Sequence, residues 1–242
     1  MGMAANQPAQ SIWLRPERSA LGRPAQHTRA RITAIALDIA DREGLDAVSM
    51  RRVAAELGTG AASLYRYVQT RDDLLDLMTD ATGAEYELGE PTGDWLADLV
   101  AVGEQARVIL RRHPWLPGLA ISRPVIGPNG VRVIEHVLAV LAGHPADLVT
   151  KMEAFALLNG ITATSVLHEQ AGGPDLQARN VAYLSHVLAS GEHPRLAALM
   201  SASPASRQTA SGDVIDPADR YPDILARLLT GLLGPHPRPS VG

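Results

Sequence analysis

The side chains best suited to contacting a nucleic acid lie close together between residues 51 and 71. They are hydrogen-bond donors, and they comprise Arg51, Ser63, Tyr65, Arg66, Tyr67 and Arg71. An arginine can donate two parallel hydrogen bonds to the edge of a guanine, or it can bind a phosphate. A tyrosine hydroxyl can donate to a phosphate oxygen. The competing interpretation is that Tyr65 packs inside the protein and that Arg51 is a solvated charge.

A helix-turn-helix would hold these donors in place. The pattern predicts one helix over Ser49–Leu57, with Ser49 as its N-cap, and a second over Ala61–Val68. The short segment 58–60 between them contains glycine, as is typical of this motif. The second helix would enter the major groove with its N-terminal residues against base edges. Its outer face is expected to present Ala61, Ala62, Ser63, Tyr65, Arg66 and Tyr67, with Leu64 and Val68 turned inward.

Two further helices would flank this motif. An apolar stripe at helical spacing predicts a helix from Thr28 to Gly44. A fourth helix is expected from Asp72 to about Glu87, capped by Thr70, with acidic side chains where the helix dipole favours them. Arg71 and the start of this helix would suit a phosphate.

These segments resemble the signature of the TetR (tetracycline repressor) family of transcriptional regulators. The resemblance covers about residues 30–80 and rests on SMRRVAAELG at 49–58, ASLYRYV at 62–68 and RDDLL at 71–75. Beyond residue 94 it is weaker. There RRHPWL at 111–116, SRP at 122–124 and LARLLTGL at 225–232 are similar to the tetracycline-repressor type of C-terminal domain.

The resemblance implies an all-α homodimer with a three-helix DNA-binding head and a ligand pocket in a larger helical body. The head is expected over 28–75, and the ligand-binding and dimerisation domain over 76–242. The fourth helix would be the lever between them. Ala61 and Ala62 replace larger or polar residues of the family, so base readout would be thin or would move to Arg51, Tyr67 and the N-terminal arm.

Charge is distributed unevenly along the chain, although the net charge is only −4. Residues 1–71 carry ten arginines against six acidic residues, and the remainder carries 12 basic against 20 acidic residues. A basic module on an acidic body favours DNA binding, because phosphate contacts supply most non-specific affinity. Residues 1–27 are expected to be a flexible basic arm. Its Arg15, Arg18 and Arg23 either enter the minor groove or belong to a solubilising tail.

The remaining chain shows helical patterns and no strand signals. Helices are expected over 95–112, 131–141, 146–170, 176–189 and about 218–233, with a loop rich in Ser, Ala, Thr and Pro over 201–216. The ligand pocket is expected between the fourth helix and the first three of these. Its candidate polar groups are Asn159, His136, His168 and His113. Each could equally be an ordinary hydrogen-bonded residue of the core or surface.

Two helices are candidates for the dimer interface, which the family builds as a four-helix bundle. The helix over 146–170 is rich in small residues, and the last helix is apolar over more than one stripe. The interface candidates are Phe155, Gly160, Ala163, Leu225, Leu228, Leu229 and Leu232. The alternative is that both helices belong only to the core of a single chain.

Several classes of function lack support in the sequence. It contains no Cys, no glycine-rich phosphate loop, no nucleophile elbow and no paired His and Glu at metal-binding spacing. We therefore expect no enzyme, no catalytic residue, no cofactor and no metal site. No apolar run is long enough to span a membrane, and a cytoplasmic location is expected. The sequence predicts a repressor that a small apolar ligand releases from palindromic operator DNA. A DNA-binding or architectural protein that needs no ligand is the alternative.

Overall fold

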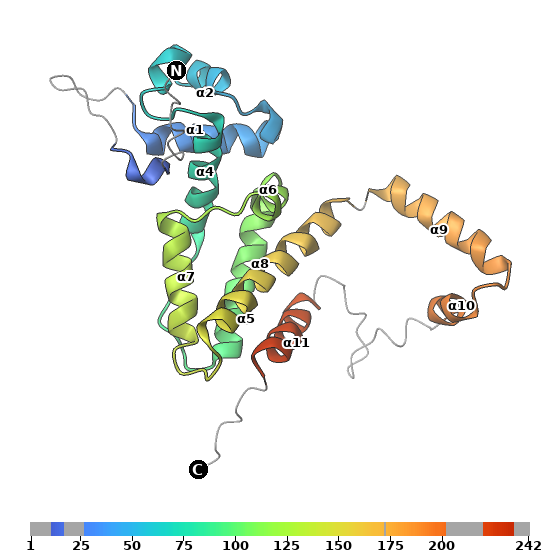
Figure 1. The fold of residues 1–242 in the computed structure, drawn as a ribbon. Helices are drawn as coiled ribbons and strands as arrows, with labels where there is room; N and C mark the ends of the chain where they lie inside the picture. The colour runs from blue at the N-terminus through green and yellow to red at the C-terminus, as the bar shows by residue number, and fades with distance from the viewer. Residues whose placement is uncertain (1–10, 17–26, 172, 202–219, 235–242) are drawn as a thin grey trace, which may run out of the picture. The chain divides into compact units, whose positions relative to one another are not determined.

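The computed structural model describes residues 11–16, 27–171, 173–201 and 220–234, and every regular element in these ranges is helical (Figure 1). The expected all-α fold is confirmed. The chain divides into two compact units, residues 1–145 and 146–242. The expected domain boundary near residue 75 lies within the first unit and stays a prediction. Among the described helices, none is both long and apolar enough to cross a membrane.

The first unit begins with the expected three-helix head. It consists of α1 (Arg29–Glu43), α2 (Met50–Glu56) and α3 (Ala61–Leu64). Thr28 accepts a hydrogen bond from the Arg31 backbone, and Ser49 caps α2 in the same way through Arg52. Gly44 ends α1 with a φ of +87°, a conformation that L side chains rarely adopt. The head core is closed by fully buried Ile32, Ile39, Val53, Leu64 and Leu74.

The fourth helix, α4 (Arg71–Thr82), begins at the expected cap but ends earlier than expected. The chain continues as a short 3-10 turn, η3 (Gly83–Glu85). A Cβ on Gly83 would stand 3.0 Å from Cβ of Asn129, so the chain passes close to the next helical layer here. The α-helix α4 therefore ends where its backbone comes close to Asn129.

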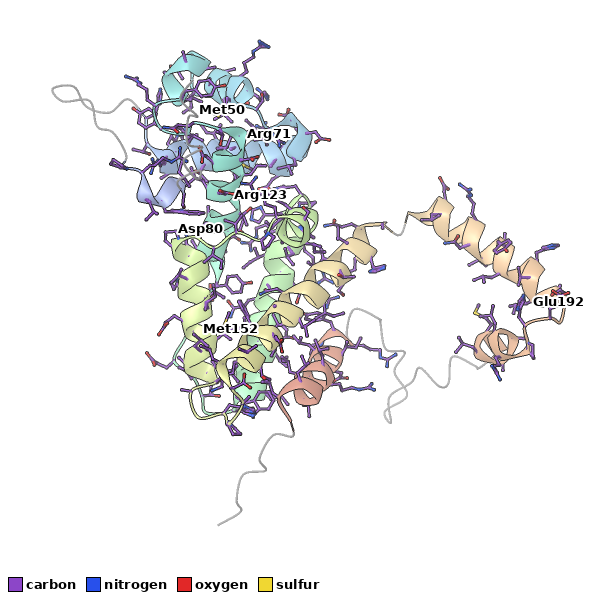
Figure 2. The ribbon with its side chains drawn as sticks, viewed as in Figure 1. Met50, Arg71, Asp80, Arg123, Met152 and Glu192 are labelled. Carbon is purple, nitrogen blue, oxygen red and sulfur yellow. The ribbon has the colours of Figure 1, made fainter. Side chains whose placement is uncertain are left out.

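Three helices complete the first unit: α5 (Trp95–Arg112), α6 (Leu116–Ser122) and α7 (Pro128–Val140). The pattern predicted α5 with its bounds and α7 three residues short, and it missed α6. The side chain of Asp80 in α4 accepts hydrogen bonds from the backbone of Asn129 and Gly130 at 3.0 Å each. Asp80 thereby caps the N-terminus of α7, where a carboxylate also meets the favourable end of the helix dipole (Figure 2).

The second unit contains α8 (Leu148–Ala171), α9 (Pro174–Ala189), α10 (Pro194–Ser201) and α11 (Tyr221–Leu233). The pattern missed α10, and most of the loop expected over 201–216 lies outside the described residues. The helices α8 and α11 pack on each other. Thr162 of α8 and the Tyr221 hydroxyl of α11 lie 2.5 Å apart in this packing.

Candidate nucleic-acid interface

The turn between α2 and α3 fixes the start of the recognition helix. The Ser63 hydroxyl donates to the Gly60 carbonyl at 2.7 Å and lies 2.9 Å from the Thr59 hydroxyl. These contacts occupy the side chain in the turn itself. Ala61 is half-buried and Ala62 is exposed, and neither side chain carries a polar group. The N-terminal part of α3 therefore offers a small, mostly apolar surface.

Three donors of the predicted group do lie on the outside of the head. Tyr65 is 51% exposed, and Arg51 and Arg66 are exposed as well. The Arg66 guanidinium makes one long hydrogen bond, 3.4 Å to the Ser63 carbonyl. Arg51 has no hydrogen bond or ion pair to any residue that the structure describes. These side chains can therefore turn to an external partner without breaking strong internal contacts.

Arg52, the neighbour of Arg51, is already committed within the head. Its guanidinium contacts the Glu43 carboxylate at 2.8 Å and the Glu56 carboxylate at 3.0 Å. The hydrogen bond from Arg52 is the main cause that lowers the pKa of the Glu43 carboxyl. Adjacent arginines thus differ in availability, and Arg51 is the one that can reach DNA.

Tyr67 is a correction to the expected surface. Only 5% of Tyr67 is exposed, and its backbone carbonyl accepts a hydrogen bond from the Arg29 side chain at 3.0 Å. The sequence pattern places Tyr67 outside because it predicts a helix over Ala61–Val68, whereas α3 ends at Leu64 and a turn follows. Beyond that point the spacing of about 100° per residue no longer holds. Arg66 lies over the buried ring, with Cζ 6.0 Å from its centroid.

Arg71 also has an internal role that the sequence did not reveal. Its guanidinium donates to the carbonyls of Val48 and Leu45 at 3.2 Å each, and so ties the chain before α2 to the start of α4 (Figure 2). The free N–H groups at this helix start are partly satisfied by a capping box between Thr70 and Asp73. The start of α4 is therefore less suited to a phosphate than we expected.

The segment 11–16 belongs to the head and is not a flexible part of an arm. Ile12, in the 3-10 turn η1 (Ile12–Leu14), is buried, and its carbonyl accepts a hydrogen bond from Arg29 at 3.1 Å. Arg15 forms an ion pair with Asp73 and donates to Gln69 at 2.7 Å. Arg15 is thus bound within the head, which differs from both the minor-groove contact and the solubilising tail that we considered. Arg18 and Arg23 lie outside the described residues.

Asp73 is the shared partner of the N-terminal segment and of the α4 cap. Burial raises the pKa of its carboxyl, but hydrogen bonds from Arg15 and Thr70 outweigh burial, so the pKa lies below its ordinary value. The charged form of Asp73 is consequently favoured in the folded head.

The four expected ligand-binding side chains have different surroundings. His113 is buried between two carboxylates, Asp41 and Glu85, so both of its ring nitrogens are already partnered. This finding contradicts the prediction that His113 is a ligand-binding residue. His168 is exposed and bonds to Thr164 of its own helix at 2.8 Å. His136 and Asn159 are half-buried, and for them a ligand contact stays a prediction, as does the pocket itself.

Surface grooves of the first unit do not coincide with these residues. One open groove of about 270 Å³ lies along α1 and α4, and another of about 340 Å³ lies beside Trp115. None of the four expected ligand residues lines either groove. The buried Arg107 of α5 is a further charged residue of the body that the sequence did not reveal.

Comparison with known proteins agrees with the order of these elements. The family model for bacterial regulatory proteins of the tetR family matches residues 32–78. The model for the tetracyclin repressor-like C-terminal domain matches residues 89–232. The HTH-type transcriptional repressor DrrR1 of Streptomyces coeruleorubidus is 36% identical over 233 residues, which cover 91% of this chain and 83% of that protein.

Solved structures show the same fold. Apo ActR from Streptomyces coelicolor has a TM-score of 0.74 and 32% identity, covering 88% of this chain and 98% of its own. ActR in complex with actinorhodin has a TM-score of 0.71 and 32% identity, covering 86% and 97%. ActR in complex with (S)-DNPA has a TM-score of 0.72 and 33% identity, covering 86% and 98%.

Proposed function

Because the chain belongs to the TetR family of bacterial regulatory proteins, we propose that it is a cytoplasmic repressor, and not an enzyme, that binds palindromic operator DNA as a homodimer and is released by a small apolar ligand. The observation that carries the DNA part is the group of available donors outside the helix-turn-helix, namely Arg51, Tyr65 and Arg66. They are exposed, and none is held by a strong internal contact.

Base readout in this proposal depends mainly on Arg51 and Tyr65. Ala61 and Ala62 offer only methyl groups, which suit the methyl of thymine. Ser63 is occupied in the turn, although its hydroxyl oxygen can still accept a hydrogen bond. Tyr67 and Arg71 contribute indirectly, without contacting DNA. The Tyr67 ring supports the Arg66 guanidinium, and Arg71 holds the chain before α2 in place. The two heads of a dimer would lie about one helical turn apart on the DNA, roughly 34–36 Å, or one groove step further.

A matched pair of arginine variants tests the DNA surface. The probe is a duplex selected by the native protein from a random-sequence pool, with an unselected duplex for comparison. Arg51→Ala should cost about 1–3 kcal/mol on the selected duplex if Arg51 reads a base. If Arg51 touches only a phosphate, both duplexes should weaken alike and the salt slope should fall by about one. Arg52→Ala is the control, because Arg52 is bound to Glu43 and Glu56.

Loss of all three donors gives the decisive outcome. The triple variant Arg51→Ala, Tyr65→Ala, Arg66→Ala should lose most operator affinity while its thermal unfolding stays near that of the native protein, because the three side chains are exposed. Full affinity in the triple variant would show that another surface of the head binds DNA.

The ligand part of the proposal is supported by ActR, which has been solved with actinorhodin and with (S)-DNPA. We propose that the body takes a small, largely apolar ligand, oriented by a few polar groups such as Asn159. Ligand binding would then change the spacing of the two heads. A ligand can release DNA only by as much as it prefers the spacing that does not bind.

Fluorescence polarisation of a labelled operator duplex measures this effect directly. Actinorhodin, (S)-DNPA and a panel of apolar small molecules are the probes. An effector should weaken operator binding about 5–150-fold, the usual range of allosteric coupling. If the duplex binds normally and no compound changes its affinity, the protein is a DNA-binding regulator without a ligand switch.

A further inference from the structure

His113 joins three segments of the first unit at a single buried point. It is the C-cap residue of α5, and only 5% of it is exposed. Its Nδ1 lies 2.8 Å from the Asp41 carboxylate, which belongs to α1 of the DNA head. Its Nε2 lies 2.7 Å from the Glu85 carboxylate, which closes the turn η3 after α4. One ring therefore bridges the head to the far end of the lever helix.

Each of the two carboxylates has a second donor. Trp115 donates its indole N–H to Asp41 at 2.7 Å. Arg112 forms an ion pair with Glu85. The rings of His113 and Trp115 also contact each other, with centroids 5.9 Å apart. Asp41 and Glu85 thus contact the His113 ring directly, and Arg112 contacts Glu85.

The chemistry of imidazole limits how His113 can satisfy both neighbours. A neutral ring has one N–H donor and one bare nitrogen acceptor, whereas an ionised carboxylate only accepts. The imidazolium form donates from both nitrogens, and hydrogen bonds between charged groups are the stronger kind. A neutral ring would leave one nitrogen lone pair facing a carboxylate oxygen inside the protein, which is unfavourable.

We propose that His113 is a positioning residue that pins α1 of the DNA head to the end of α5 and to the turn η3 after α4, by donating one ring N–H to Asp41 and the other to Glu85. Pro114 and Trp115 follow it directly and lead into α6, so a shift of α6 reaches α1 through Asp41. The Asp41 half of this connection involves Trp115 at the start of α6, and the Glu85 half involves the turn η3 that follows α4. The homodimer used in the distance test and the part that concerns an effector rest on the proposed function, whereas the two hydrogen bonds of His113 do not.

Two substitutions separate the two hydrogen bonds. The Asn amide of His113→Asn can replace Nδ1 and reach Asp41, whereas the longer Gln of His113→Gln can replace Nε2 and reach Glu85. Each variant keeps one half of the bridge. His113→Phe keeps the ring without any donor. His186→Gln is the matched control, because His186 is exposed on α9.

Distances between the heads provide a readout that needs no effector. The chain contains no Cys, so Ala55→Cys on the exposed face of α2 gives one spin label per subunit of a dimer. Pulsed electron paramagnetic resonance should give a narrow label-to-label distance distribution for the native background. We expect the distribution to broaden in His113→Asn and in His113→Gln, to broaden most in His113→Phe, and to stay native in His186→Gln. All samples are measured well below their unfolding temperatures.

The protonation of the ring is tested separately by ¹⁵N NMR of the imidazole, with His113 assigned from the spectrum of His113→Gln. Both ring nitrogens should give the shifts of protonated nitrogen in the native protein. With Asp41→Asn the Nδ1 partner loses its charge, and the ring should move toward a neutral tautomer. A neutral single tautomer in the native protein would overturn the double-donor bridge.

The distance measurement also separates this proposal from the proposed function. If His113→Asn and His113→Gln lower the thermal stability but leave the distance distribution native, the residue only packs and the pin is wrong. If the distribution broadens but no probe compound releases the native protein from DNA, the pin stands and the ligand switch fails. If actinorhodin or another probe does act, its effect on operator affinity should shrink toward 1-fold in both variants, and an undiminished effect would overturn the coupling role.

Discussion

Gly127 lies directly against Asp80. A Cβ on Gly127 would stand 2.5 Å from Cγ of Asp80 and 2.4 Å from Cζ2 of Trp13. Asp80 can cap α7 only because the chain before this helix passes so close to α4, and only glycine permits the approach. The same contact brings the N-terminal segment, through Trp13, against the loop that leads into α7. Three distant parts of the sequence therefore meet at one residue without a side chain.

Gly127→Ala should destabilise the first unit. The new methyl group must displace the Trp13 ring or the Asp80 carboxylate, and overpacking of this kind costs about 1–3 kcal/mol. The urea midpoint of unfolding measures the effect. Gly118→Ala in α6 is the control, because a Cβ there meets nothing within 4 Å, and removing a helical glycine should stabilise by roughly 0.5–1 kcal/mol. Equal midpoints for the two variants would contradict the close contact.

The charge of Asp73 should make the stability of the head depend on acidity. Its folded-state pKa is below the ordinary value, since hydrogen bonds from Arg15 and Thr70 outweigh the opposing effect of burial. A group with a lowered pKa stabilises the fold fully above its unfolded-state pKa, about 3.9 for Asp, and loses this contribution as the pH falls through the folded-state pKa.

Asp73→Asn removes this titration and tests the sign. Near neutral pH the variant should be less stable than the native protein by up to about 3 kcal/mol, the range for hydrogen bonds to charged groups. The difference in unfolding free energy should shrink in acid, below about pH 4. Chemical unfolding at a series of pH values measures it. A difference that grows as the pH falls would mean that the charged form of Asp73 does not stabilise the head.

The effect of N-terminal truncation on the unfolding temperature should depend sharply on whether residues 11–16 are kept. Deleting residues 1–10 removes no charged side chain and should leave the unfolding temperature unchanged. Deleting residues 1–16 also removes the buried Ile12 and the Arg15 partner of Asp73. Burial of one such aliphatic side chain is worth about 1.5–3 kcal/mol, and each kcal/mol shifts the midpoint of a chain of this size by about 2–4 °C.

The boundary also distinguishes a structural role of Arg15 from a role in DNA binding. Thermal unfolding and operator affinity should be measured on the same samples. If the deletion of residues 1–16 leaves the unfolding temperature intact but lowers affinity, then Arg15 acts on DNA and its contact with Asp73 is not the important one.

Local signals in the sequence predicted local structure well. Ser49 and Thr70 were identified as caps from residue type alone, and both accept the expected backbone hydrogen bonds. The exposed position of Tyr65 also followed from helical spacing. Tyr67 did not, because no residue near Leu64 marks the early end of α3. A turn held by tertiary contacts leaves no composition signal of its own.

Contacts between residues far apart in the sequence could not be predicted for the same reason. His113 is separated from Asp41 by 72 positions and from Glu85 by 28. Nothing in the spacing of these residues relates them, since they meet only when α1, η3 and α5 have packed. The sequence offered His113 as a candidate polar group for a ligand or as an ordinary hydrogen-bonded residue, and its position in the sequence fits both equally well. Only the geometry distinguishes the two.

The last helix shows why the apolar pattern of α11 was wider than one stripe. Tyr221, Leu225, Leu229 and Leu233 are buried, on the side that packs on α8. Ile224 and Leu232 lie on a second stripe and are exposed, with the half-buried Leu228 between them. Two of the expected interface residues, Leu225 and Leu229, are therefore core residues of their own chain. On α8, Ala163 is buried, while Phe155 and Gly160 are half-buried.

The outer stripe of α11 is the part that a second subunit would cover. The double variant Ile224→Glu, Leu232→Glu should sediment as a monomer, because two charges at a closely packed apolar interface cannot be desolvated cheaply. It should keep the native circular dichroism spectrum and lose operator affinity, since one head contacts only half of a palindromic site.

Arg227→Glu is the control for a changed charge on the same helix, because Arg227 is also exposed. Leu225→Glu should instead unfold the second unit, and the contrast between the stripes separates an interface from a core. A double variant that remains dimeric and binds the operator normally would place the dimer contact elsewhere.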